Sequence, residues 1–338
     1  MAFSLSCYDV AYYGVVAFTV VNLVWYLLEY LSIGDYKNRP VFVTGCDSGF
    51  GYKLAIKLLE NGFPLFAGCY SEKGEDQLKK AAKGLQGKLV TVPIDVTKQE
   101  SVDKAVEIVK SHLGDKGLWG LVNNAGVLSN NGPDEWLNIT DYEQAFAVNT
   151  FGVIRVTQAF RPLVKLARGR IVTTSSAMAR MPFIYSAPYN TSKYAVNGYC
   201  DTIRLEMKQW GVSVHILEPG FFATDFFTIE IIRRKMDQLW ERVPSAVKAV
   251  WGQHWFDFVR KNIKENSLDR GSTRTYMVAD DYFHALTSRF PRPRYNPGYD
   301  CKFALVPMSL MPTWLMDFFI DLLIVKPAGL PTPAALQH

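Results

Sequence analysis

The sequence contains few of the residues that form metal centres or disulfide frameworks. Its five cysteines are far apart, show no CxxC spacing and are odd in number, and its five histidines are equally scattered. Such spacing argues against a disulfide framework and against a zinc site. We therefore predict that no metal takes part in the function.

Long runs of one charge, internal repeats and low-complexity tracts are also absent. The formal net charge of +5 is spread over 338 residues, so nothing indicates nucleic acid as a partner. With 49% hydrophobic and 20% charged residues, the chain is long enough for one large α/β domain with elaborations or for two ordinary domains.

One long uncharged stretch lies near the N-terminus. Residues 10–28 read VAYYGVVAFTVVNLVWYLL and contain no Asp, Glu, Lys, Arg or His. Because about 20 apolar residues cross a hydrocarbon layer as a helix, we predict a membrane anchor over residues 8–33. A cleaved signal peptide would begin with a basic region, whereas no Lys or Arg precedes Lys37, and a core helix would need a partner layer. Lys37 and Arg39 follow the span, which places the rest of the chain on the cytoplasmic side.

After this stretch, short apolar runs rich in Val, Ile and Phe alternate with longer amphipathic segments. The runs are residues 41–44, 65–69, 89–92, 118–122, 170–174 and 212–217. Strands separated by helices indicate βαβ units and hence a parallel sheet that is covered on both faces. We therefore predict an α/β fold, a Rossmann-type doubly wound parallel sheet over residues 38–300, with an N-terminal transmembrane helix and a hydrophobic C-terminal extension over residues 301–338.

The first predicted strand leads into a glycine-rich turn. The stretch VFVTGCDSGFG places Gly45, Gly49 and Gly51 between a strand and a helix, in the pattern TGxxxGxG. Glycines there let the backbone turn sharply and approach a pyrophosphate, and a helix N-terminus favours the anion. The pattern differs from GxGxxG, and taken alone it fits an ordinary tight turn equally well.

Three further motifs follow in order: NNAG at 123–126, SS at 175–176 and YNTSK at 189–193. Together with the glycine turn, they make the chain resemble the short-chain dehydrogenase/reductase family over about residues 38–226. The stretches VTGCDSGFG, GLWGLVNNAG, EPGFF and RYNPGYD are similar to the branch of retinol, hydroxysteroid and 3-hydroxybutyrate dehydrogenases. The resemblance implies an oxidoreductase that acts on CH–OH groups with a nicotinamide cofactor.

The resemblance also implies the catalytic roles. Tyr189 is the acid/base, Lys193 tunes its pKa and binds the cofactor ribose, and Ser176 orients the substrate oxygen. Asn149 supports a water molecule that relays protons. These roles agree with the chemistry of the side chains. Free tyrosine titrates at about pH 10, and a neighbouring ammonium together with a positive nicotinamide ring favours its phenolate form.

Two neighbouring residues are alternatives to these catalytic side chains. Tyr185 also lies near the serine pair, but only Tyr189 has a lysine four residues later, so we expect Tyr185 to line the pocket or to be structural. Ser175 is the alternative to Ser176, which has the family spacing of 13 residues to Tyr189.

Asp47, inside the glycine turn, bears on the choice of cofactor. The family places this part of the turn near the adenosine ribose, where a carboxylate accepts hydrogen bonds from ribose hydroxyls and repels a 2′-phosphate. Members that use NADP have Arg or Lys before the second glycine or after the second strand, and here Ser48 and Tyr70 take these positions. The usual acid at the end of the second strand is also missing, since Cys69 occupies that place. We therefore predict NAD as the cofactor. NADP is the alternative, because Lys73 is near enough in the sequence to supply a positive charge for the 2′-phosphate.

The same resemblance implies the remaining cofactor contacts. They are Gly45, Ser48, Gly49 and Gly51 in the turn, Asp95 at the adenine edge, Asn123 and Gly126 beside the cofactor, and Pro219 and Gly220 by the nicotinamide. Tyr189 and Lys193 also face the cofactor. Members of the family commonly form dimers through the helices that carry Asn149 and Tyr189, so a homodimer is one of the assemblies that the sequence leaves open.

Aromatic residues are dense between Phe221 and Phe258, which predicts a substrate lid over about residues 221–265. The aromatics are Phe221, Phe222, Phe226, Phe227, Trp240, Trp251, Trp255, Phe256 and Phe258. Apolar lining supplies most of the burial of a large hydrophobic ligand, although each of these side chains alone fits packing onto the sheet as well. We therefore predict a retinoid, a steroid or a similar lipid as the alcohol or carbonyl substrate.

The C-terminal extension is apolar but interrupted. Residues 303–325 read FALVPMSLMPTWLMDFFIDLLIV, and their two prolines and two acids are unfavourable in a spanning helix. We predict an interfacial helix pair or a hydrophobic flank over the substrate mouth, with plain core packing as the alternative.

The predicted function is a membrane-anchored oxidoreductase that transfers a hydride between NAD(H) and a hydrophobic alcohol or carbonyl. We expect the endoplasmic reticulum membrane, with the mitochondrial membrane as the alternative. A rival function is a mitochondrial dehydrogenase of a small 3-hydroxy acid such as 3-hydroxybutyrate, whose carboxylate would need Arg180, Arg233 or Arg234. A third is a non-catalytic nucleotide- or lipid-binding membrane protein, which would be expected to have lost Tyr189 or Lys193.

Overall fold

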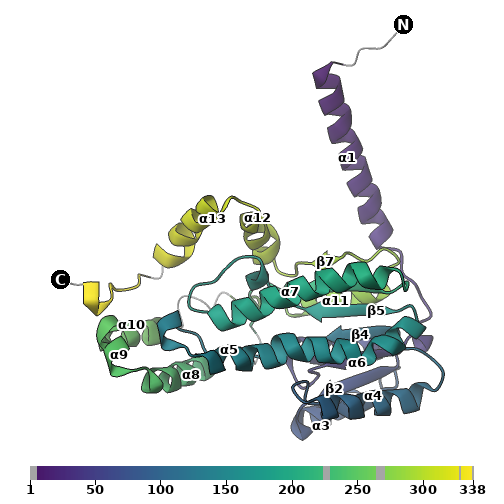
Figure 1. The fold of residues 1–338 in the computed structure, drawn as a ribbon. Helices are drawn as coiled ribbons and strands as arrows, with labels where there is room; N and C mark the ends of the chain where they lie inside the picture. Colours follow the sequence, from purple (N-terminus) through teal and green to yellow (C-terminus); the bar gives the residue numbers. More distant parts are fainter. Residues whose placement is uncertain (1–5, 224–228, 264–270, 327–328, 337–338) are drawn as a thin grey trace.

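A computed structural model describes residues 6–223, 229–263, 271–326 and 329–336 (Figure 1). Its centre is a seven-stranded sheet in which every neighbouring pair of strands is parallel. The strands are β1 (Val41–Thr44), β2 (Leu65–Cys69), β3 (Leu89–Pro93), β4 (Gly120–Asn123), β5 (Arg170–Thr174), β6 (Ser213–Leu217) and β7 (Arg294–Tyr295). Across the sheet they follow the order β3-β2-β1-β4-β5-β6-β7. The six predicted strands are confirmed within two residues, whereas the short β7 was not predicted.

Helices cover both faces of this sheet, so the predicted doubly wound arrangement is confirmed. One face carries α2 (Gly49–Glu60), α3 (Glu72–Ala81) and α11 (Tyr276–Thr287), and the other carries α4 (Gln99–Leu113), α5 (Ile139–Phe146), α6 (Val153–Leu166) and α7 (Ala187–Lys208). Successive side chains of a strand point to opposite faces. In β1, Phe42 packs among the α4, α6 and α7 side chains and stacks on Phe160 with ring centroids 4.4 Å apart, whereas Val41 and Val43 pack towards α2 and α11.

The chain order reverses between β1 and β4. From β1 the chain winds outwards through β2 to β3 and then returns to β4 on the other side of β1. The loops after β1 and β4 therefore diverge, and doubly wound sheets bind ligands in the crevice that such loops leave at the carboxyl ends of the strands. Gly45 begins this crevice with a φ of +72°, and a Cβ there would lie 2.9 Å from the Cα of Ala125.

The first helix, α1 (Cys7–Glu29), projects away from the sheet (Figure 1). It begins at a capping box, in which the Ser6 hydroxyl accepts a hydrogen bond from the Asp9 N–H and the Asp9 carboxylate accepts one from the Ser6 N–H. Among the described residues it is the one helix that is long and apolar enough to cross a membrane, and its apolar side chains are exposed. This exposed apolar helix indicates membrane association, as predicted.

The C-terminal end of α1 is held firmly against the sheet domain. The Glu29 carboxylate pairs with Arg292 at 2.5 Å, and the Glu29 carbonyl accepts hydrogen bonds from His284 at 3.0 Å and from the Ser288 hydroxyl at 2.7 Å. An isolated β-bridge then joins Ser32 to Ser288. The helix is therefore attached to the domain through its last turn.

Three short helices after β6 form a separate aromatic cluster. They are α8 (Ile229–Arg242), α9 (Ser245–Trp251) and α10 (Gln253–Ile263). The cluster centres on the buried Trp136, whose ring lies 4.7 Å from that of Trp240 and 5.3 Å from that of Trp255. Of the predicted lid, residues 224–228 and 264–265 lie outside the described residues, and these include Phe226 and Phe227.

The C-terminal extension has an inner and an outer side. It consists of α12 (Val306–Ser309) and α13 (Thr313–Ile320), with π-helical turns over Cys301–Leu305 and Asp321–Val325. The inner side packs on Ala177 and Met181 through buried side chains, namely Cys301, Leu305, Met308 and Ile320. The outer side exposes Phe303, Leu310, Trp314 and Phe318 by 54% to 75%. The predicted core packing therefore describes the inner side, and the outer side is an exposed apolar surface.

Candidate active site

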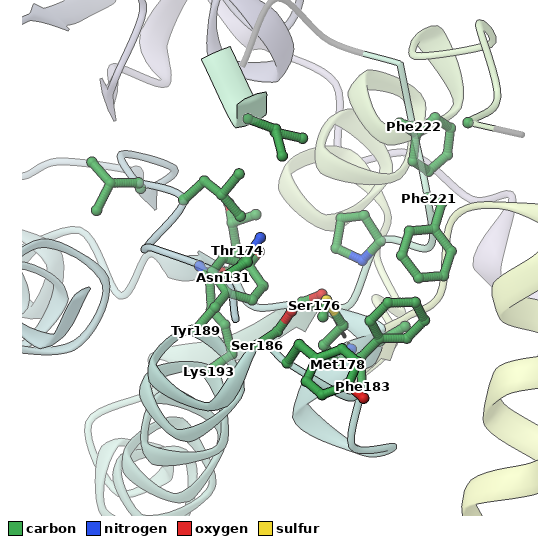
Figure 2. Close-up of a pocket in the computed structure, with 18 of the residues that line it drawn as sticks. Asn131, Thr174, Ser176, Met178, Phe183, Ser186, Tyr189, Lys193, Phe221 and Phe222 are labelled. Atoms are coloured by element: carbon green, nitrogen blue, oxygen red, sulfur yellow. Dashed lines mark hydrogen bonds between the residues drawn. The ribbon is translucent and has the colours of Figure 1, made fainter. Parts of the chain in front are cut away.

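A cavity of about 940 Å³ lies at the carboxyl ends of the central strands. Its lining includes the residues directly after β1, β2, β3, β4 and β5 and the Pro219–Gly220 turn after β6, together with side chains from α7, α8 and α10. One end is formed largely by the glycine turn and the loop after β4, and the other by aromatic side chains. Figure 2 shows Ser176 between Tyr189 and Lys193 on one side and Phe221 on the other.

Most of the predicted site residues line this one cavity. Those that line it are Gly45, Asp47, Ser48, Gly49, Asp95, Gly126, Ser176, Tyr189, Lys193, Pro219 and Gly220. Those that do not are Gly51, Asn123 and Asn149. Each of these three exceptions has a structural reason.

The Asn123 side chain points away from the cavity, and its place beside the cofactor stays a prediction. Its amide donates to the hydroxyls of Thr157 at 2.8 Å and Thr173 at 3.4 Å, and the residue is only 2% exposed. Its neighbour Asn124 lines the cavity instead and donates to the carbonyls of Thr44 at 2.9 Å and Gly45 at 3.0 Å. The reason is the alternation of side chains along an extended strand.

Gly51 supports the glycine turn from behind. A Cβ at this position would lie 2.2 Å from the Gly45 carbonyl oxygen and 2.4 Å from the Asn124 Nδ2, so only glycine fits. Gly49, which begins α2 with a φ of +61°, does line the cavity. The N-terminus of α2 therefore faces the cavity, and its unpaired N–H groups and dipole suit a phosphate there.

The Asp47 carboxylate is held by the turn that follows β2. It accepts hydrogen bonds from the N–H groups of Tyr70 at 2.9 Å and Ser71 at 2.7 Å, and from the Ser71 hydroxyl at 2.8 Å. A Cβ at Gly74 would lie 2.6 Å from this carboxylate, so Gly74 makes room for it. The prediction that ribose hydroxyls are the partners of Asp47 is therefore incomplete, because the chain's own amides bind it. The same contacts carry its negative charge to the end of β2, next to Cys69.

Helix α7 presents Tyr189 and Lys193 one turn apart. The Lys193 Nζ donates to the Thr174 carbonyl at 3.0 Å and lies 5.7 Å from the centre of the Tyr189 ring. Lys193 is 4% exposed, and the Ser176 hydroxyl accepts a hydrogen bond from the Met178 N–H at 3.2 Å. The helix therefore brings the acid/base candidate and the buried ammonium to the end of β5, where Ser176 lies.

Burial governs the protonation of this pair. It raises the pKa of Tyr189 to about 12, and the hydrogen bond with Ser176 acts in the opposite direction. It also lowers the pKa of Lys193 to about 8. Desolvation therefore outweighs the Ser176 hydrogen bond at Tyr189, and the prediction that Lys193 and a positive nicotinamide ring together lower the Tyr189 pKa stays a prediction.

Asn149 lies behind the cavity wall, in a π-helical turn over Ala147–Gly152. Its amide exchanges hydrogen bonds with Val127, accepting from the N–H at 2.8 Å and donating to the carbonyl at 3.0 Å, and it donates to Ser192 at 3.1 Å. A Cβ at Gly126 would lie 3.3 Å from the Asn149 Oδ1. The predicted support of a relay water stays a prediction, and the contacts described here brace the loop after β4.

The other end of the cavity is lined mainly by apolar side chains. Phe183 and Phe221 contact each other with ring centroids 5.5 Å apart, and Tyr185, Trp255 and Phe258 also line the wall. The lining role of Tyr185 was predicted. Of the predicted lid aromatics, Trp240, Trp251 and Phe256 pack within the cluster around Trp136 and do not line the cavity.

Several lining residues were not predicted. From the loop after β4 they are Asn131, Gly132, Pro133 and Trp136, and Asp300 joins them just before the C-terminal extension. The extension itself contributes Leu305, Leu323 and Leu330, at the position expected of the predicted hydrophobic flank over the substrate mouth. The loop is tied to the opposite wall, because the Gly132 N–H donates to the Tyr185 carbonyl at 2.8 Å. The run of Asn, Gly and Pro marks a loop, but nothing in the sequence shows that it borders the cavity.

The three arginines proposed for a small acid substrate do not line the cavity. Arg180 pairs with Glu218 at 2.6 Å, and Arg233 donates to the carbonyls of Arg260 and Lys261. Within the described ranges, Lys193 is the one basic side chain in the lining. The wall beyond the catalytic side chains therefore offers little to a small carboxylate.

A doubly wound sheet, a glycine-lined crevice at its reversal point and a buried lysine beside a tyrosine and a serine define a class, the dehydrogenases that use a nicotinamide cofactor. A model of the short chain dehydrogenases matches residues 39–231. The chain therefore belongs to the short-chain dehydrogenase family. It is an oxidoreductase that acts on CH–OH groups with a nicotinamide cofactor.

Individual relatives agree with this family. The chain is 42% identical over 304 residues to 17-beta-hydroxysteroid dehydrogenase type 6 of Homo sapiens, covering 90% of this chain and 94% of the relative. It is 41% identical over 307 residues to retinol dehydrogenase 7 of Rattus norvegicus, covering 91% and 95%. A solved short-chain dehydrogenase from Burkholderia phymatum in complex with NAD matches the fold with a TM-score of 0.67 at 21% identity, covering 86% and 97%. The predicted resemblance to the retinol and hydroxysteroid branch is confirmed.

Proposed function

We propose that this protein interconverts a hydrophobic alcohol and its carbonyl, a retinoid, a steroid or a similar lipid, with NAD(H) as the cofactor. The observation that carries the proposal is that one cavity combines the glycine turn at the α2 N-terminus, here called the glycine end, with a wall of aromatic side chains, here called the aromatic end, and also contains Ser176, Tyr189 and Lys193. The named activities of the retinol and hydroxysteroid dehydrogenase relatives support the same substrate class.

The residues at the glycine end fit a dinucleotide. The α2 N-terminus with Ser48 and Gly49 would hold the pyrophosphate, and Asp95 would contact the adenine edge. Lys193 would bind the nicotinamide ribose. When bound, the nicotinamide exchanges the hydride and carries a positive charge in its oxidised form.

The protein's own groups then handle the proton and the oxygen. In the oxidation, Tyr189 accepts the hydroxyl proton of the substrate, and Ser176 donates a hydrogen bond to the oxygen as it becomes a carbonyl. Because burial holds the pKa of Tyr189 at about 12, the phenolate needs positive charge nearby. Lys193 supplies part of that charge, since its pKa of about 8 keeps it largely protonated at neutral pH.

The preference for NAD follows from the position of Asp47. Its carboxylate lies against the N–H groups of Tyr70 and Ser71, at the end of β2 where the family's NAD-specific acid is usually found. A 2′-phosphate placed there would meet this negative charge, and neither Ser48 nor Tyr70 offers a positive one. Lys73, which is exposed one turn further on, is the residue that would favour NADP.

Both rival functions are less well supported. A small 3-hydroxy acid would need a cation on the cavity wall, and Arg180 is engaged by Glu218 instead. A non-catalytic binding protein would be expected to have lost Tyr189, Lys193 or Ser176, and all three are present in the cavity lining.

We also propose that α1 anchors the enzyme by a single span, in the endoplasmic reticulum membrane with the mitochondrial membrane as the alternative. For the domain limits we keep those predicted from the sequence. They are an anchor over 8–33, a catalytic domain over 38–300 and an extension over 301–338. The exposed outer side of α12 and α13, with Trp314 and Phe318, suits contact with the lipid surface. A homodimer remains a prediction.

The test is a substrate panel with protein purified in detergent. All-trans-retinol, an androgen diol and 3-hydroxybutyrate are each offered with NAD and with NADP, and cofactor reduction is followed by absorbance. We expect reduction of NAD with retinol or the diol and little with NADP. Activity on 3-hydroxybutyrate alone would contradict the substrate class, and a preference for NADP would contradict the role of Asp47.

A further inference from the structure

A buried carboxylate, Glu218, lies directly between β6 and the Pro219–Gly220 turn that borders the cavity. Its side chain is 0% exposed, and it does not line the cavity. A carboxylate in such a place is strongly unfavourable unless it is paired and fully hydrogen-bonded. The partners of Glu218 therefore show which parts of the protein it holds together.

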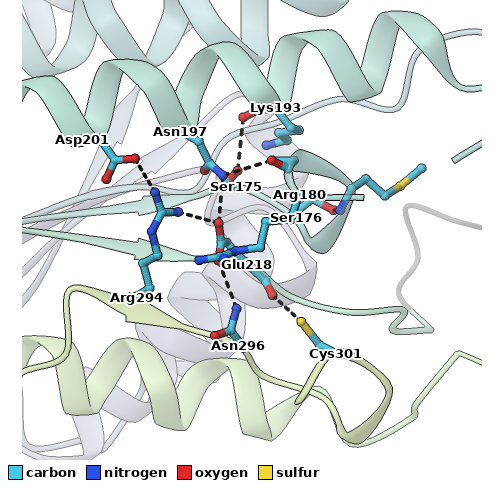
Figure 3. Close-up of polar contacts among 12 residues, drawn as sticks. Ser175, Ser176, Arg180, Lys193, Asn197, Asp201, Glu218, Arg294, Asn296 and Cys301 are labelled. Carbon is cyan, nitrogen blue, oxygen red and sulfur yellow. Dashed lines mark hydrogen bonds and ion pairs between the residues drawn. The ribbon is translucent and has the colours of Figure 1, made fainter. Parts of the chain in front are cut away.

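Four donors surround this carboxylate (Figure 3). One oxygen accepts from Arg180 at 2.6 Å and from Asn296 at 3.0 Å, and the other accepts from Asn197 at 2.8 Å and from Arg294 at 2.6 Å. These four bonds use the acceptor positions of an ionised carboxylate. Glu218 is thus fully satisfied by the chain itself.

Two of the donors belong to the segments that carry the catalytic side chains. Arg180 lies four residues after Ser176, in the same loop. Asn197 lies four residues after Lys193 and eight after Tyr189, so the three side chains share one face of α7. Glu218 therefore connects the Ser176 loop to the helix that carries Tyr189.

The main chain makes a parallel connection on both sides of Ser176. The Ser175 N–H donates to the Leu217 carbonyl at 2.7 Å, and the Ala177 N–H donates to the Pro219 carbonyl at 3.0 Å. These two acceptors flank Glu218 in the sequence. Any shift of the Glu218 turn would therefore move Ser176 with it.

We infer that Glu218 is a positioning residue that sets the place of the Ser176 hydroxyl relative to the Tyr189 hydroxyl. The inference rests on the proposed alcohol oxidation, in which both hydroxyls contact the same substrate oxygen. Proton and hydride transfer depend steeply on such alignment, and a displacement of about 1 Å can lower a rate about 100-fold. Glu218 itself touches no reacting atom.

A second buried carboxylate in the chain supplies a matched control. Glu29 is 8% exposed at its side chain and pairs with Arg292, but it lies at the end of α1 and does not line or border the cavity. Glu29→Gln and Glu218→Gln both neutralise a buried carboxylate of the same size. A purely stabilising role predicts the same consequences for both.

The first measurement compares these two variants with the parent. We expect Glu218→Gln to lower kcat by about 10- to 100-fold and to change the Kd for NAD much less, because the pyrophosphate contacts lie at the α2 N-terminus even though Pro219 and Gly220 would border the nicotinamide. Glu29→Gln should lose thermal stability and keep its kcat. Equal kcat losses in the two variants, or an unchanged kcat in Glu218→Gln, would overturn the inference.

The second measurement is a double-mutant cycle with Ser176→Ala. If Glu218 acts through the placement of Ser176, the double variant should be only slightly slower than Ser176→Ala alone. Additive losses would overturn the inference. Should Glu218→Gln fail to fold, Arg180→Met replaces it in the cycle, because the Arg180 side chain is 23% exposed and its loss disturbs the interior less.

A third measurement needs no substrate and separates this inference from the proposed function. Amide hydrogen exchange over residues 175–182 should be faster in Glu218→Gln and unchanged in Glu29→Gln, because the Ala177 N–H depends on the Glu218 turn. A parent that oxidises no alcohol would contradict the proposed function, whereas unchanged exchange in Glu218→Gln would overturn the positioning role itself.

Discussion

The two ends of the cavity are built by different means. The glycine end is formed by main chain and small residues that follow one another in the sequence, from Gly45 to Gly49, and side chains such as Asp47 and Asn124 brace it. The aromatic end is assembled from side chains far apart in the sequence, including Phe183 and Trp255. At the glycine end an added Cβ at Gly45 or Gly51 would overlap neighbouring atoms, whereas the aromatic end changes its shape when one side chain is replaced. Substitutions at the two ends should therefore affect the cofactor and the substrate separately.

The largest effect is expected where the two ends meet, at Tyr189. Tyr189→Phe removes the hydroxyl that exchanges the proton, so kcat should fall by about 1,000-fold while NAD binding persists. The measurement is steady-state oxidation together with NAD titration. Tyr194→Phe, on the exposed side of the same helix, should behave as the parent. Equal activity of Tyr189→Phe and the parent would contradict the mechanism.

The next effect concerns Lys193 and is a dependence of stability on pH. The pKa of Lys193 is about 8 in the folded protein and has its ordinary value of 10.5 in the unfolded chain. Between pH 8 and 10 the unfolded chain therefore binds more protons at this lysine, so the contribution of Lys193 to stability rises with pH. Lys193 should therefore add roughly 2 kcal/mol to the free energy of unfolding over this window, while the buried thiols of Cys69, Cys200 and Cys301, whose pKa values burial raises to about 12, lower it in every variant.

Lys193→Met is the control for that measurement, because it removes the titrating lysine and keeps the thiols, so the free energy of unfolding of the parent minus that of Lys193→Met should increase by roughly 2 kcal/mol from pH 8 to pH 10. Denaturant unfolding of both proteins at pH 8, 9 and 10 gives the difference. The window ends at pH 10 because Tyr189, with its pKa of about 12, begins to oppose the trend above its ordinary value of 10.0. Parallel pH curves for the two proteins would show that Lys193 is not desolvated.

At the glycine end, Gly51→Ala should weaken NAD binding without any contact to the cofactor. The added methyl would overlap the Gly45 carbonyl, and overpacking of this kind costs about 2 kcal/mol, or about thirtyfold in Kd. Gly198→Ala is the matched control, because Gly198 also lies in a helix and a Cβ there meets nothing within 4 Å. If Gly51→Ala lost affinity for retinol and kept its affinity for NAD, the conclusion that the glycine end serves the cofactor would be contradicted.

The smallest effect is expected at the aromatic end. Phe183→Ala removes a ring that packs on Phe221, which should raise the KM for retinol by about tenfold and leave that for NAD unchanged. A short alcohol such as 2-propanol, which cannot reach this wall, serves as the control and should be affected less. A raised KM for NAD instead would show that the two ends are not independent.

The glycine end was also the part that the sequence predicted best. The turn, the strands and Ser176, Tyr189 and Lys193 follow local patterns in which a few neighbouring residues determine the geometry, and the cavity contains them. The Asn123 side chain, predicted beside the cofactor, is one step along the chain from that of Asn124, and this step turns it away from the cavity. No local pattern distinguishes Asn123 from Asn124.

The sequence predicted less where a side chain depends on a distant partner. Asp47 finds its amides 23 and 24 residues later, and Arg180 finds Glu218 38 residues later. Such pairings arise from the tertiary arrangement and leave no periodic trace along the chain. The same applies to the pKa of Tyr189, which is set by desolvation in the folded protein more than by its neighbour Lys193.

The attachment of α1 has a consequence for how the enzyme meets its substrate. Only Tyr30 and Leu31 separate the end of the helix from the Ser32–Ser288 bridge, and Glu29 is already bonded to the domain. Because this connection is so short, the domain cannot rotate freely relative to a bilayer that α1 crosses. The domain would keep a fixed distance from the bilayer and a fixed orientation relative to it. The enzyme would then encounter lipid alcohols by two-dimensional diffusion along the membrane rather than by diffusion through water.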